Sequence, residues 1–65
     1  MNKTFEDYQR RVINEKVELD TRLKKLQAFL KKDIEIANDE LDRLNRQLEA
    51  MTRYSRILGE RIKAF

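Results

Sequence analysis

Apolar residues recur at steps of three and four through almost the whole of this 65-residue chain. In an α-helix this spacing places them in one narrow stripe, the seam of a coiled-coil-like helix. There are two such seams, and the chain therefore belongs to the all-α class. In the first seam only Lys16 is charged, and its members are Phe5, Tyr8, Val12, Lys16, Leu19, Leu23, Leu26 and Leu30. In the second seam only Ser55 is polar, and its members are Ile34, Ala37, Leu41, Leu44, Leu48, Met51, Ser55, Leu58, Ile62 and Phe65.

The register of the pattern slips by one residue between the two seams, which indicates two helices. Asn38 is a suitable N-cap for the second, and the acidic residues after it suit the positive end of a helix dipole. We expect one domain over 1–65, with helices at about 4–31 and 38–64 and a connection at about 32–37. The connection has no Gly or Pro, so one continuous helix through residues 31–38, in a longer coiled coil, is the alternative.

The two seams match when the chain is folded back near residue 35, because facing residues then have numbers that add to 70 or 71. The only two strongly polar seam residues, Lys16 and Ser55, fall opposite each other in this arrangement. A buried polar layer of this kind can fix the register of a helix pair. The match predicts an antiparallel two-helix hairpin with Lys16 and Ser55 as its polar core layer.

Charged residues, 42% of the chain, support the helices. An acid followed four residues later by a base stabilises an isolated helix by about 0.2–0.5 kcal/mol. Seven such pairs occur: Glu6–Arg10, Asp7–Arg11, Glu18–Arg22, Asp20–Lys24, Asp39–Arg43, Asp42–Arg46 and Glu49–Arg53.

A single hairpin of this length has little core, and the sequence predicts that it assembles with copies of itself. Chains this short gain stability from disulfides, metals or partner subunits. Cys and His are absent, which excludes disulfides and the usual zinc sites. Apolar residues beside the two seams form the expected oligomer interface of a homo-oligomeric helical bundle. Those of the first helix and those of the second lie on opposite faces of the hairpin. They are Ile13 and Val17 on the first helix and Ala50, Tyr54 and Ile57 on the second.

The same composition argues against an enzyme. Without His or Cys no His-based or Cys-based nucleophilic site can be built, and there is no glycine-rich phosphate loop. We expect no catalytic residues, no metal and no cofactor. No apolar run has the length of a membrane span or of a signal-peptide core, which predicts a cytoplasmic protein.

Arginines and a tyrosine gather in the C-terminal third, where residues 43–65 carry six basic and two acidic groups. Arginine suits bidentate contact with phosphate, and tyrosine can stack on a base. This favours an anionic-ligand site at a subunit junction; the competing interpretation is ordinary helix charge, since Arg53 follows Glu49 and Arg56 precedes Glu60. The candidate ligand-binding residues are Arg46, Arg53, Tyr54, Arg56 and Arg61.

The stretches YQRRVINEKVELDTRLKKLQAFL (8–30) and RQLEAMTRYSRILGERIKAF (46–65) resemble a family of very small phage-encoded proteins related to a crAss-like phage gene product. The resemblance covers nearly the whole chain and implies a phage accessory gene, a class that often encodes inhibitors of host defence. It brings no activity and no catalytic residues. A looser resemblance, in architecture and charge alone, is to the helical-hairpin phage sponges that sequester signalling nucleotides of the anti-CBASS and anti-Thoeris kind.

Three functions are compatible with these features. The first is a counter-defence protein in the host bacterial cytosol that sequesters an anionic nucleotide, such as a cyclic oligonucleotide. The second is a module that inhibits a host protein through one helix face. The third is a purely structural coiled coil. The net charge of +3 is weak for duplex DNA binding. The oligomer number and the identity of the ligand or target are open.

Overall fold

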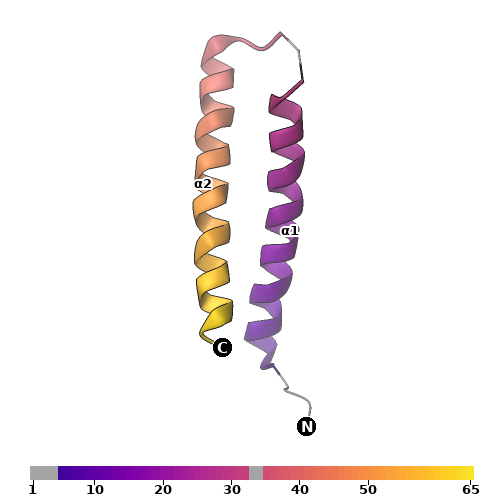
Figure 1. Cartoon of the computed structure of the whole chain (residues 1–65), viewed down its shortest axis with the longest axis vertical. Coiled ribbons are helices and arrows are strands. Elements are labelled where there is room, and N and C mark those ends of the chain that lie inside the picture. Colours follow the sequence, from indigo (N-terminus) through magenta and orange to yellow (C-terminus); the bar gives the residue numbers. More distant parts are fainter. Residues whose placement is uncertain (1–4, 33–34) are drawn as a thin grey trace.

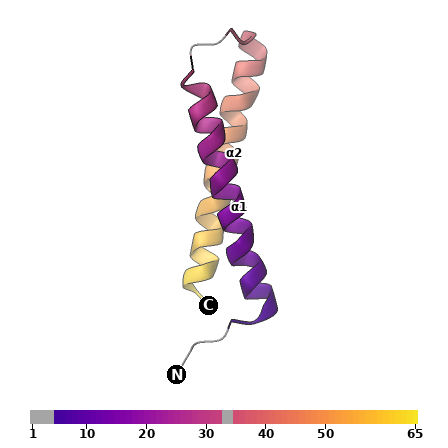
Figure 2. The ribbon, with the colours of Figure 1, turned by 90° about the vertical axis from the view of Figure 1, so that its right-hand side faces the viewer.

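The computed structural model describes residues 5–32 and 35–65, which form two antiparallel α-helices joined at one end (Figure 1). α1 spans Asp7–Leu30 and α2 spans Asn38–Lys63. The helices lie side by side and cross at a shallow angle (Figure 2). The predicted all-α hairpin is confirmed, and the alternative of one continuous helix is wrong. Among the described residues, no helix is both long and apolar enough to span a bilayer.

The helix ends are stabilised by local hydrogen bonds. The Glu6 backbone N–H, at the start of α1, donates to Gln9 Oε1 at 2.8 Å, which satisfies one of the orphan donors of the first turn. At the start of α2 the N-cap is Ala37, so the expectation of an Asn38 cap is wrong by one residue. The Asp39 carboxylate accepts a hydrogen bond from the Glu40 N–H at 3.0 Å, and so satisfies one first-turn N–H group that a capping side chain would otherwise bind. Of the expected helix bounds, residue 4 lies outside the described residues.

The core of the hairpin lies in the half that contains the chain termini. Val12, Leu19 and Leu58 are buried there, and Met51, Ile62 and Phe65 pack against them. The end is closed by aromatic rings: Phe65 makes edge contacts with Phe5 and Tyr8, with ring centroids 6.2 and 6.0 Å apart. Toward the connection, the seam residue Leu41 is 37% exposed. The seam residue Ile34 lies outside the described residues.

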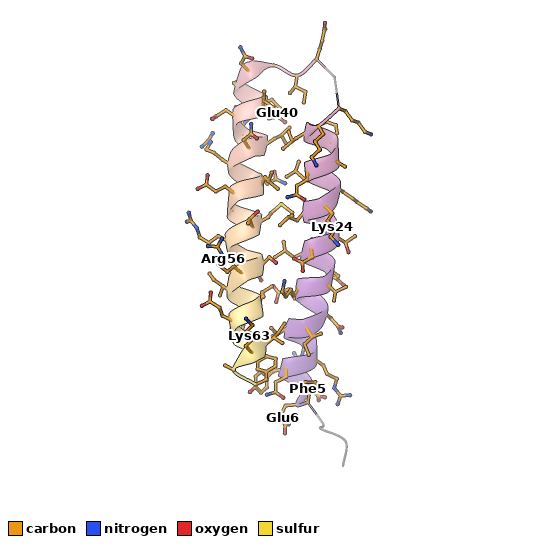
Figure 3. All side chains as sticks on the ribbon, viewed as in Figure 1. Phe5, Glu6, Lys24, Glu40, Arg56 and Lys63 are labelled. Atoms are coloured by element: carbon orange, nitrogen blue, oxygen red, sulfur yellow. The ribbon has the colours of Figure 1, made fainter. Side chains whose placement is uncertain are left out.

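The molecule is a thin rod of 53 × 16 × 15 Å with a radius of gyration of 15.4 Å. A compact domain of 65 residues would have a radius of gyration of about 11 Å. Each helix therefore buries one stripe and leaves the rest of its circumference exposed, as the side chains in Figure 3 show. Any ligand or partner must bind on this outer surface, because the interior has room only for the seam.

Candidate functional site

A polar layer crosses the seam in the middle of the hairpin. Lys16 Nζ donates to Ser55 Oγ at 2.9 Å and also to Asp20 Oδ2 at 2.8 Å. Ser55 Oγ in turn donates to the other carboxylate oxygen, Asp20 Oδ1. Gly59 lies beside the Lys16 stem, since a Cβ at that position would lie at a contact distance of 3.4 Å from Lys16 Cε. Lys16 and Ser55, which the sequence places opposite each other, thus form a closed triad with Asp20.

The sequence pattern missed Asp20, which it paired with Lys24. The structure pairs Asp20 with Lys16 because the ammonium group needs a counter-charge where it enters the seam. The hydrogen bond from Lys16, reinforced by that from Ser55, holds the pKa of Asp20 below its usual value of 3.8. The Asp20 side chain is 36% exposed, so water screens the pair and its contribution to stability is moderate.

The depressed pKa of Asp20 makes the layer sensitive to acid. The stabilisation is present above the unfolded-state pKa of 3.8 and is lost as pH falls through the lower folded-state pKa. We expect Asp20→Asn to unfold at a lower temperature than the wild type at pH 7, and the gap in Tm to close as pH falls below 3.8. Thermal unfolding followed by circular dichroism across this range measures the gap. A gap independent of pH would show that the charge of Asp20 adds nothing.

The second polar feature is an open groove on the outer side of α2, which we call the arginine groove. Its larger part, of about 430 Å³, is lined by Asn45, Leu48, Glu49, Thr52, Arg53 and Arg56. An adjoining part of about 230 Å³ is lined by Arg46, Glu49, Ala50 and Arg53. Arg53 and Glu49 line both parts, so the two form one strip along α2. Sequence reasoning missed Asn45 and Thr52, which have no signature other than their place on the helix.

The three arginines of the groove differ in how far their charge is already neutralised. Arg46 Nε lies 3.1 Å from Asp42 Oδ2, and Arg53 Nη2 lies 3.4 Å from Glu49 Oε1. Arg56 makes no ion pair with any described residue, Glu60 included, and it extends from the outer edge of α2 (Figure 3). Arg56 is therefore the groove cation most available to an external anion.

Tyr54 and Arg61 lie elsewhere on α2. Residues two positions apart on a helix point to nearly opposite sides, so Tyr54 faces away from Arg56. Neither Tyr54 nor Arg61 lines the groove. Arg61 is exposed and has no ion pair with a described residue. Within one hairpin, the five candidate ligand residues thus form two groups on different flanks of α2.

The candidate interface residues also divide between two flanks. On α1, Val17 is 61% exposed and Ile13 is half-buried. On α2, Ala50 is exposed, Tyr54 is 43% exposed and Ile57 is 48% exposed. The larger exposed apolar group is therefore the one on α2, where it adjoins Arg61.

A family model, described as Sequestin, matches residues 6–64, which include both helices. No curated protein and no solved structure matches the chain.

Proposed function

The chain belongs to the Sequestin family, and we propose that it is a non-catalytic protein that binds and sequesters an anionic nucleotide signal as a homo-oligomer. The family's name suggests a sequestering role, which requires binding and no catalysis. The resemblance of both helices to small phage-encoded proteins supports a role in phage counter-defence in the bacterial cytosol. The nature of the ligand rests on the chemistry of the arginine groove.

The observation that carries the proposal is the unpaired Arg56 beside two further arginines in one groove. A guanidinium binds phosphate oxygens through two parallel hydrogen bonds. Asn45 and Thr52 add a second kind of contact. Asn45 Nδ2 donates to the Leu41 carbonyl and Thr52 Oγ1 to the Leu48 carbonyl, which leaves both side-chain oxygens as acceptors. Cations next to neutral acceptors suit a ligand that carries both phosphate and sugar hydroxyl or base amino groups.

Isothermal titration calorimetry with cyclic di- and trinucleotides tests this assignment. We expect at least one of these ligands to bind, and Arg56→Ala to weaken its binding about tenfold or more, because one charge-assisted hydrogen bond contributes about 1.5–3 kcal/mol. Lys25→Ala removes an equal charge from an exposed position on α1 and is the matched control, expected to bind as the wild type does.

Two results would contradict the assignment. The first is the absence of binding across the whole panel. The second is an equal loss of affinity in Arg56→Ala and Lys25→Ala, which would mean that net charge alone attracts the nucleotide. Tyr54→Ala, on the other flank, shows whether that flank contributes to the same site.

A protein target is the alternative, and the exposed aromatic residues favour it. Tyr8 is 56% exposed, Tyr54 43% and Phe29 40%, and aromatic residues are enriched at the centres of protein interfaces. This function predicts a stoichiometric complex with a host protein that excess nucleotide leaves intact.

A further inference from the structure

α2 carries a second stripe beside its seam, formed by the residue that precedes each seam residue from 40 to 61. All members of this outer stripe are exposed. Its apolar members, Ala50, Tyr54 and Ile57, follow one another in its C-terminal half. Its polar members are Glu40 and Arg61 at the two ends and Arg43 and Gln47 in the N-terminal half. The steps of three and four are those of a helix–helix contact. The stripe is therefore a complete packing surface that the hairpin itself leaves uncovered.

We propose that the outer stripe binds the same stripe of a second copy, with the two α2 helices antiparallel about a two-fold axis at Ala50. In this register facing residues have numbers that add to 100 or 101. Ala50 then lies at the crossing point, and Tyr54 lies against Gln47 of the second copy. Ile57 lies along the side chain of its Arg43, and Arg61 lies against its Glu40. This deepens the oligomeric part of the proposed function and rests on it.

The charge of α2 fits this partner. Residues 38–50 carry four acidic and two basic groups, for a net −2, and residues 51–63 carry one acidic and four basic groups, for a net +3. An antiparallel copy of α2 places each half beside the half of opposite sign. A parallel copy would place like charges together, which is unfavourable at an interface. The helix is thus complementary to itself in one orientation only.

Groups along the stripe that lack partners would gain them in this dimer. The Tyr54 hydroxyl makes no hydrogen bond with a described residue, and Gln47 of the second copy offers an amide to it. Arg61 is likewise unpaired. Glu40 binds Arg43 through Oε1 at 2.9 Å, so its second carboxylate oxygen is available to Arg61 of the other copy. The small side chain of Ala50 lets the two backbones approach closely.

The exposed area also fits a dimer. The chain exposes 5650 Å², whereas a monomeric protein of 7.9 kDa exposes about 4,400 Å². The excess of roughly 1,200 Å² exceeds the ~800 Å² per partner that a standard stable interface buries. The exposed area is therefore large enough for a stable interface, and the charge pattern of α2 makes a second copy the occupant that fits it.

A charge exchange tests the register in the absence of nucleotide. Sedimentation equilibrium is expected to give a dimer for the wild type, with twice the 7.9 kDa mass of the chain. Arg61→Glu and Glu40→Arg alone should each weaken dimerisation about tenfold, and the double exchange should restore it to within about threefold. Lys63→Glu reverses an exposed charge on the other flank and should leave the dimer intact. A monomeric wild type, or a double exchange as weak as the single variants, overturns the proposal.

Cysteine substitutions supply a test that does not depend on dimer stability. The chain has no Cys, so Ala50→Cys should form a disulfide-linked dimer on mild oxidation, whereas Val17→Cys, on the opposite flank, should not. The reverse outcome would place the interface on the Val17 side and overturn the proposal. Both experiments omit ligand, so the two proposals can fail separately. A monomeric protein that still binds nucleotide would contradict only the proposed interface, and a dimer that binds no nucleotide would contradict only the proposed ligand.

Discussion

Leu58→Ala is expected to lower the free energy of unfolding by about 2–5 kcal/mol, the range for truncation of a buried leucine. Leu58 is 1% exposed and is the only fully buried large side chain among the described residues. It packs with Val12 and Leu19 in the terminal half of the hairpin. Few neighbouring side chains can fill the cavity, because a two-helix core has only one layer. A domain of this size has only a few kcal/mol of stability, so the variant should be largely unfolded at 25 °C.

Urea unfolding followed by circular dichroism measures this loss, at one protein concentration throughout because association adds to apparent stability. Leu41→Ala is the control. It removes the same atoms from the same seam at a position that is 37% exposed, and it should cost less than half as much. Equal losses would mean that the core is evenly distributed along the hairpin, contrary to the observed burial.

Ser55→Ala is expected to cost about 1.5–3 kcal/mol, the range for a hydrogen bond to a charged group. Ser55 is 9% exposed, and its hydroxyl joins the Lys16 ammonium to the Asp20 carboxylate. The methyl group of alanine leaves both charges with one partner fewer inside the seam. The expected result is a lower urea midpoint with an unchanged m-value, since the surface exposed on unfolding stays the same.

Thr21→Ala is the matched control for Ser55→Ala. The Thr21 hydroxyl donates to the Val17 carbonyl of its own helix at 2.9 Å and is exposed, so its removal should change stability by about 0.5 kcal/mol or less. A Ser55→Ala variant as stable as Thr21→Ala would contradict the view that the polar layer contributes to folding.

The hairpin and the contact between Lys16 and Ser55 could be predicted because both follow from the period of the seams. The role of Asp20 could not, because it lies one step off the seam and its partner depends on the facing helix. Lys16 and Asp20 are four apart with the base first, an order less favourable than acid first. Arg56 and Glu60 share this order and make no ion pair. The difference is Ser55, which holds Lys16 and Asp20 together from across the seam.

The ligand-binding candidates show a second limit of the sequence pattern. Counting arginines groups Arg53, Tyr54 and Arg61 because they are close along the chain. The helix separates Tyr54 and Arg61 from Arg46, Arg53 and Arg56, so one hairpin presents an arginine groove on one flank and an apolar stripe on another. The two surfaces meet at Ala50, which lines the smaller part of the groove, whereas the larger part, with Arg56, contains no residue of the outer stripe.

Sequestration itself is tested most directly by recovery of the ligand. A cyclic oligonucleotide that the protein binds is incubated with excess protein and filtered through a membrane that retains the complex, and both fractions are then analysed by chromatography. We expect the filtrate to be depleted of nucleotide and heat denaturation of the retained protein to release the nucleotide unchanged. A nucleotide that stays in the filtrate, or one released as a cleaved product, would contradict sequestration by a non-catalytic protein.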